Sequence, residues 1–224
     1  MTLKEIVSLL ESWRDPKNIA GMALFGISAK GTLGVPVPKL RGLARKIKTD
    51  HALALGLWET GIHEARLLAT MIADADRITP AQADAWTADF DSWDTCDQAC
   101  MNLYRRTPFA WKKACAWARS EEEFVRRAGF ALMAALAAGK AASDAKFIAL
   151  LPLIRRYSVD ERNFVRKAVN WALRQIGKRN LRLNEAALKA AKEIRKIDSK
   201  SARWIAADAI RELSHPKIAA RFKR

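Results

Sequence analysis

Apolar residues recur along this chain with the spacing of helices. In the segment 164–178 they fall three and four positions apart, which marks one buried face of an amphipathic helix. The members of this stripe are Val165, Ala168, Val169, Ala172, Leu173 and Ile176. Every other long segment has the same period, and no segment alternates apolar and polar residues as a half-buried strand does. The pattern therefore predicts an all-α protein.

The predicted helices span residues 2–13, 17–28, 37–47, 50–59, 63–73, 80–90, 93–105, 108–118, 121–138, 143–157, 161–178, 182–197, 200–213 and 216–222. The clearest loop is Lys30–Pro38, where glycine and proline break the helical pattern and a proline suits the first turn of the next helix. No linker is long or polar enough to separate two domains. We therefore expect residues 1–224 to form a single domain.

The apolar stripe occurs three times. Val125 and Ala202 take the place of Val165 in the other two copies, 40 residues before it and 37 residues after it. Helix pairs that recur at about 40 residues are typical of a HEAT-like solenoid, in which each helix buries one face against its neighbours. The repeat predicts a superhelical solenoid of HEAT-like repeats, with equivalent positions side by side along a concave groove.

Trp171 lies on the polar side of its predicted helix. At about 100° per residue it points roughly 130° away from the centre of the stripe. Its helical neighbours are Lys167, Arg174 and Lys178. A large aromatic side chain among cations suits an anionic partner that can stack, and nucleic acid is such a partner.

The repeat register extends this surface. Arg127 is equivalent to Lys167, and Trp204 holds the corresponding place in the last repeat. We therefore expect Arg127, Lys167, Trp171 and Trp204 to face the groove. Ala131 is equivalent to Trp171 in the preceding repeat and would leave space beside the indole.

The charge is concentrated in one half of the chain. The net charge is +16; residues 1–112 hold 14 basic and 13 acidic residues, whereas residues 113–224 hold 26 and 11. Such asymmetry indicates a polyanion-binding half, which makes the predicted groove basic. A merely solubilising surface is the alternative.

The remaining composition argues against other classes. Cys96, Cys100 and Cys115 form no disulfide framework, so we expect a reducing, cytoplasmic setting on the chromosome, with Cys96 and Cys100 in the core. No zinc spacing, phosphate-binding loop or dinucleotide fingerprint is present, so we expect no metal and no cofactor. The longest apolar run, Phe130–Ala138, is too short to span a bilayer, and the first residues lack the pattern of a signal peptide.

One short segment carries candidate chemistry. Within Asp89–Cys100, Asp91 or Ser92 suits the N-cap of a helix, and Trp93 and Asp97 share a face because four residues separate them. The helix macrodipole would favour the ionised form of Asp97. A core position for Trp93 and an ordinary surface acid at Asp97 are the alternatives.

A carboxylate with indole rings on a basic surface suits one reaction. A purine alkylated at N3 or N7 already carries positive charge, so it can leave its sugar without a strong general acid. Positive charge then develops on the deoxyribose, where a fixed carboxylate stabilises it and orients the attacking water. Indole faces add about 0.5–2 kcal/mol each as cation–π contacts.

From Leu24 to Leu213 the chain resembles the AlkD-type DNA glycosylase family of DNA alkylation repair proteins. The words that carry the resemblance are LGVPVPKLR (Leu33–Arg41), SWDTCD (Ser92–Asp97), FVRRAGFALM (Phe124–Met133) and FVRKAVNWALRQ (Phe164–Gln175). The resemblance implies a HEAT-like superhelix whose concave face binds DNA, and excision of positively charged N3- and N7-alkylpurines without insertion of the base into a tight pocket.

The resemblance also implies roles for single residues. Trp93 and Trp171 correspond to the aromatic side chains that contact the sugar of the lesion, and Asp97 to the carboxylate beside the scissile bond. Arg127 matches an arginine near the lesion phosphate. Phe25 falls where family members carry a DNA-contacting tyrosine, so the hydroxyl of that contact is missing here.

The sequence thus predicts a monomeric, monofunctional alkylpurine DNA glycosylase that acts on double-stranded DNA containing alkylated bases. Its substrate-binding residues would be Arg127, Lys167, Arg174, Lys178, Phe25 and Trp204. One alternative is a non-catalytic HEAT-repeat protein that binds branched or distorted DNA. Another is a protein–protein adaptor, a common use of helical repeats.

Overall fold

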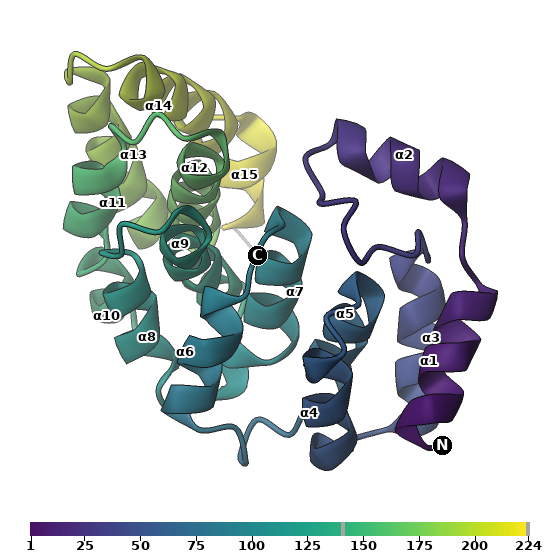
Figure 1. Ribbon diagram of the computed structural model, residues 1–224. Helices are drawn as coiled ribbons and strands as arrows, with labels where there is room; N and C mark the ends of the chain where they lie inside the picture. The colour runs from purple at the N-terminus through teal and green to yellow at the C-terminus, as the bar shows by residue number, and fades with distance from the viewer. Residues whose placement is uncertain (140–141, 223–224) are drawn as a thin grey trace. The chain divides into compact units, whose positions relative to one another are not determined.

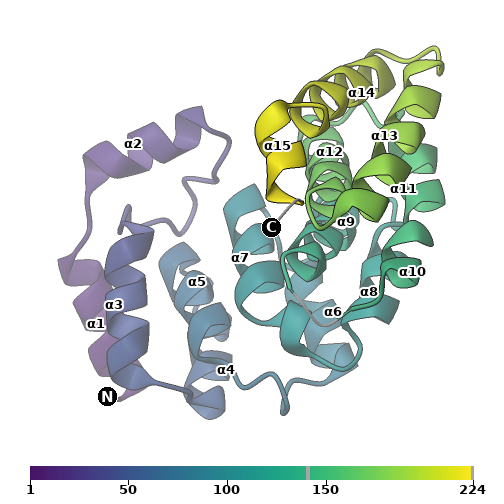
Figure 2. The same ribbon diagram turned by 180° about the vertical axis from the view of Figure 1, so that it is seen from behind.

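In the computed structural model, which describes residues 1–139 and 142–222, all regular secondary structure is helical (Figures 1 and 2). The all-α prediction is confirmed for these residues. The chain divides into two compact units, Met1–Ala110 and Trp111–Arg224, and each is described by itself. A single domain over residues 1–224 stays a prediction.

The first unit contains seven α-helices and one short 3₁₀ helix. They are α1 (Leu3–Ser12), α2 (Pro16–Leu24), α3 (Val37–Ile47), α4 (His51–Glu59), α5 (His63–Ile72), α6 (Pro80–Ala88), α7 (Trp93–Asn102) and η1 (Tyr104–Arg106). The central element is α5, which packs against α3, α4 and α7. Eight of its ten residues are buried, so it forms the core on which α7 rests.

The second helix is shorter than its sequence predicts. Asp15 caps it by accepting hydrogen bonds from the backbone N–H groups of Lys17 and Asn18, and Pro16 starts its first turn. It ends at Leu24 instead of residue 28, because Gly26 has a φ of 76° that an α-helix does not accommodate. None of the residues of α2 is buried.

A buried carboxylate holds the loop between α2 and α3. The side chain of Glu64 accepts hydrogen bonds from the backbone N–H groups of Leu33 at 2.8 Å, Gly34 at 2.7 Å and Val35 at 3.1 Å. Gly34 has a φ of 82°, and a Cβ there would lie 2.4 Å from the carbonyl oxygen of Asp15. Only glycine fits this close approach.

The second unit holds α8 (Ala110–Trp117, whose first residue belongs to the first unit), α9 (Glu123–Ala137), α10 (Asp144–Ile148), α11 (Leu151–Tyr157), α12 (Asn163–Gly177), α13 (Leu181–Arg195), α14 (Lys200–Leu213) and α15 (Pro216–Arg221). Figures 1 and 2 show α11 and α13 side by side, and both pack against α12. On its other sides α12 packs against α9 and α14.

The predicted stripe of α12 is confirmed, since all six of its residues are fully buried. Side chains of successive repeats contact one another. The rings of Phe124 and Phe164, which begin α9 and α12, lie 5.5 Å apart, and Asn170 Nδ2 donates to Asp208 Oδ2 of α14 at 2.7 Å. Gly129 lets α9 approach the end of α8, where a Cβ would lie 2.2 Å from the Ala118 nitrogen.

Two further predictions have clear outcomes. The single helix expected over residues 143–157 is wrong: α10 ends at Ile148 and α11 starts at Leu151, because the ring of Pro152 occupies a first turn. The core placement of Cys96 and Cys100 is confirmed, since both are fully buried. Within residues 1–139 and 142–222, every helix is too short or too polar to traverse a lipid bilayer.

Candidate functional site

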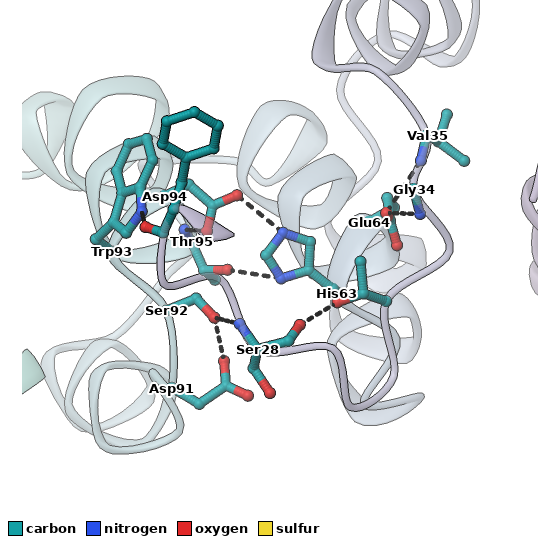
Figure 3. Close-up of polar contacts among 12 residues, drawn as sticks. Ser28, Gly34, Val35, His63, Glu64, Asp91, Ser92, Trp93, Asp94 and Thr95 are labelled. Carbon is teal, nitrogen blue, oxygen red and sulfur yellow. Dashed lines mark hydrogen bonds and ion pairs between the residues drawn. The ribbon is translucent and has the colours of Figure 1, made fainter. Parts of the chain in front are cut away.

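Ser92 fixes the start of α7 through two hydrogen bonds of its hydroxyl. Ser92 is the N-cap residue, as the sequence predicted, but its hydroxyl caps no N–H group of α7. It donates to Asp91 Oδ1 at 3.1 Å and accepts from the backbone N–H of Ser28 at 3.0 Å, as Figure 3 shows. The hydroxyl thus ties the start of α7 to the loop that follows α2.

Trp93 is half-buried, and a hydrogen bond that it donates to the end of α2 sets its orientation. Its Nε1 donates to the carbonyl oxygen of Phe25 at 3.0 Å. The side chain of Phe25 is 75% exposed, and Leu24 beside it is 87% exposed. Two apolar side chains therefore stand on the surface next to the carbonyl that holds the indole.

Asp97 lies one turn further along α7 than Trp93 and is also half-buried. Its neighbour Gln98 is fixed by two donors, Arg41 Nη2 and Asn102 Nδ2, each at 3.0 Å from Gln98 Oε1. Through Arg41, the residue next to Asp97 therefore ties α7 to α3.

His63 on α5 provides an anchor for α7 that sequence reasoning missed. Its Nε2 lies 2.9 Å from Asp94 Oδ2 and its Nδ1 lies 3.4 Å from Thr95 Oγ1 (Figure 3). Burial, the largest single influence, disfavours a charged imidazole, but the hydrogen bond to Asp94 and the charges of Asp94, Glu64 and Asp91 outweigh it. Together they raise the pKa of His63 above 6.5.

This raised pKa predicts a pH-dependent stability. Because the folded protein holds the His63 proton more tightly than the unfolded chain, the stabilisation is fully present below about pH 6.5 and is lost as the pH rises through the raised pKa. The free energy of unfolding of the wild type in urea should therefore exceed that of His63→Gln by an amount that shrinks as the pH rises above about 6.5. A constant difference over this range would contradict a charged imidazole.

In the second unit, Trp171 is half-buried on α12. With the amide of Gln175 turned to satisfy both of its polar atoms, the amide oxygen accepts from Trp171 Nε1 at 3.1 Å and from Lys178 Nζ at 3.2 Å. Lys167, one turn before Trp171, is exposed. The indole is thus oriented by a side chain of its own helix.

Two of the predicted DNA-binding cations are paired with a carboxylate of α14. Arg174 Nη1 lies 2.6 Å from Glu212 Oε2, and Lys178 Nζ lies 3.0 Å from Glu212 Oε1. Burial, the largest single influence, would raise the pKa of Glu212, but the hydrogen bonds and charges of these cations outweigh it and lower the pKa below 4.5. Glu212 therefore neutralises part of the basic face of α12.

Arg127 is more deeply buried than Lys167, its equivalent in the next repeat. Arg127 is 5% exposed, and its Nη1 donates to the carbonyl oxygen of Phe164 at 2.7 Å. The physical reason is that α9 is covered on almost every side, with eleven of its fifteen residues buried. Arg127 thus stabilises the start of α12.

Trp204 at the start of α14 is 40% exposed. The guanidinium carbon of Arg166 lies 5.3 Å from the centre of its ring. This cation–π contact presents an aromatic face and a cation together. In the part of the chain that the structure describes, no group of three or more His, Cys, Asp or Glu side chains could hold a metal ion.

The sequence profile of a family described as DNA alkylation repair enzyme matches residues 6–213. The chain belongs to this family. Membership in the DNA alkylation repair enzyme family confirms the predicted resemblance to AlkD-type proteins. No curated protein sequence matches the chain at a significant level.

A solved structure supports the fold assignment. It is described as a new family of proteins related to the HEAT-like repeat DNA glycosylases with affinity for branched DNA structures. It matches with a TM-score of 0.79 and 21% sequence identity, over 95% of each chain. The HEAT-like fold expected of a DNA alkylation repair protein is thereby confirmed.

Proposed function

We propose that this protein is a monofunctional DNA glycosylase that removes positively charged N3- and N7-alkylpurines from duplex DNA. The observation that carries the proposal is the pair Trp93 and Asp97, one turn apart on α7, with the indole held by the Phe25 carbonyl. Membership in the DNA alkylation repair enzyme family supports it.

In this proposal Asp97 acts as a fixed negative charge beside the reacting sugar. When the C1′–N bond breaks, its electron pair neutralises the alkylated base, and positive charge moves to the deoxyribose. The Asp97 carboxylate stabilises that charge and orients the water that attacks C1′, while the proton of that water passes to solvent. Trp93, one turn from Asp97, would offer its electron-rich face to the same cationic sugar, and the corresponding role of Trp171 stays a prediction from the family resemblance.

The DNA backbone would be held by cations and by exposed aromatic rings. The net charge of +16 favours association with a polyanion, and Lys167 is an exposed cation beside Trp171. Trp204 and Phe25 expose rings that can pack against sugars or bases. Arg127 would act indirectly, because it holds the first turn of the helix that carries Lys167 and Trp171.

Base release from methylated duplex DNA tests the proposal. Purified protein should liberate 7-methylguanine or 3-methyladenine and leave an abasic site in an uncut strand, since no lysine is assigned as a Schiff-base nucleophile. Free base is measured by chromatography, and strand integrity by denaturing electrophoresis. Folded protein that binds the duplex but releases no base above background would reject the enzymatic role.

A non-catalytic protein that binds branched DNA is the second candidate. It is favoured by the similarity to a structure whose family has affinity for branched DNA structures. This candidate predicts tighter binding to a four-way junction than to a duplex of equal length, and no base release. Measuring both quantities on one preparation separates the two functions.

The pairing of Glu212 leads to a prediction about DNA affinity. Glu212→Gln should release Lys178 and leave Arg174 paired only with Asp208 at 3.4 Å, so affinity should rise and the slope of log affinity against log salt should steepen by up to about 1.8. Glu185→Gln is the matched control, because it removes the same charge from an exposed position of α13. Equal salt slopes for Glu212→Gln and Glu185→Gln would show that the ion pairs of Glu212 do not limit DNA binding.

A further inference from the structure

A hollow of about 480 Å³ opens in the first unit, where the later parts of α3, α5 and α7 come together. It lies outside the turn of α7 that carries Trp93 and Asp97, and all of its lining residues belong to Met1–Ala110. Its walls include Met71 of α5 and Met101 and Asn102 of α7.

The hollow is lined by cations. Five of its ten lining residues are basic and none is acidic; the basic residues are Arg41, Arg45, Lys48, Arg105 and Arg106. None of these five forms an ion pair with a carboxylate of residues 1–139 and 142–222. This contrasts with α12, where Glu212 neutralises two cations.

Convergence of like charges costs stability. Arg41 and Arg45 face the same side of α3 because four residues separate them, and like charges at that spacing destabilise a helix. The carbonyl groups at the end of α3 favour a cation nearby, which accounts for Arg45. η1 brings Arg105 and Arg106 to the same hollow from the end of α7, where Arg106 Nη2 also donates to the carbonyl oxygen of Ala73 at the end of α5 at 3.5 Å.

A strained backbone lies at the edge of the same hollow. Lys48 has a φ of 65°, the only positive value at a non-glycine residue in the described part of the chain. A side chain in this conformation costs about 1–3 kcal/mol, and such strain collects at ligand-binding positions. Lys48 is the residue at which α3 ends, and its strained backbone therefore belongs to one of the residues that line the hollow.

We propose that this hollow binds a phosphate group of DNA. The proposal rests on the proposed DNA binding but not on base excision. Arginine side chains match phosphate oxygens with paired N–H donors, and a concave site lined from several elements can surround one anion. The phosphate would come from an internal phosphodiester or from the phosphomonoester at a strand end.

Paired variants test the site. Arg45→Ala combined with Arg105→Ala removes two lining cations, and Lys4→Ala combined with Lys46→Ala removes the same charge from exposed positions outside the hollow. Binding is measured by fluorescence anisotropy on one duplex sequence with either a 5′-phosphate or a 5′-hydroxyl. We expect the first variant to lose about tenfold or more in affinity and the control to lose less.

The two duplexes identify the source of the phosphate. If the Arg45→Ala, Arg105→Ala variant loses affinity for both duplexes, the bound group is an internal phosphodiester. If it loses affinity only for the 5′-phosphorylated duplex, the bound group is the phosphate at a strand end. If both variants bind both duplexes equally, the proposal is overturned.

A readout without DNA separates this site from the proposed function. Inorganic pyrophosphate should raise the melting temperature of the wild type and of the control variant more than that of the hollow variant. Equal shifts for all three proteins would overturn the site, even if base release is observed. Unequal shifts in a protein that releases no base would support the site while the excision proposal fails.

Discussion

Asp97→Asn is expected to lower base release from methylated duplex DNA by about 10²–10³-fold, which is the usual cost of removing one preorganised electrostatic group. Asparagine keeps the size of the side chain but carries no charge to stabilise the cationic sugar. Single-turnover release of 7-methylguanine measures the chemical step without product release. Affinity for the undamaged duplex should stay nearly the same, because the change removes no cation.

The matched control for this variant is Asp91→Asn, two residues before Trp93. Its amide oxygen can still accept the hydrogen bond from Ser92, so the start of α7 should be preserved. We expect this control to release base at nearly the wild-type rate. Equal activity of Asp97→Asn and wild type would remove Asp97 from the mechanism, whatever the control does.

Glu64→Ala is expected to destabilise the protein by several kcal/mol, since each buried N–H group left without an acceptor costs about 1–3 kcal/mol. Three backbone N–H groups, those of Leu33, Gly34 and Val35, would lose their acceptor. Leu33 and Val35 are buried, so water reaches these groups poorly. The free energy of unfolding in urea measures the effect.

Glu59→Ala is the control for this experiment, because Glu59 is exposed on the neighbouring helix α4. Substitutions of that kind usually change the free energy of unfolding by no more than about 0.5 kcal/mol. Glu64→Gln should fall between the two, since an amide oxygen can accept but carries no charge. A cost for Glu64→Ala as small as that of the control would show that the loop is held by other contacts.

Helix positions could be predicted because burial follows a local period. The stripe of α12 depends only on which residues are apolar and on 3.6 residues per turn, and all six of its members are buried. Helix ends were harder to predict when they depended on one residue. Gly26 ends α2 early, and Pro152 starts a separate helix, because each restricts the backbone more than the apolar pattern reveals.

The candidate site was also predictable from the sequence only in part. That Trp93 and Asp97 share a face follows from their spacing, and Lys167 is exposed as its place on the helix indicated. Arg127 is buried whereas its equivalent Lys167 is exposed, because a position in the repeat does not tell how completely the neighbouring helices cover α9.

The sequence by itself determined the all-helical repeat, the family and the residue types available for chemistry. Each of these depends on the local spacing of residues or on short sequence motifs. Only the tertiary structure decided which charges remain available. His63 meets Asp94 after 31 residues, and Arg174 meets Glu212 after 38. Such pairs form because folding brings distant helices together. Hydrogen bonds act only over about 3 Å, and no local sequence pattern tells which side chains come that close.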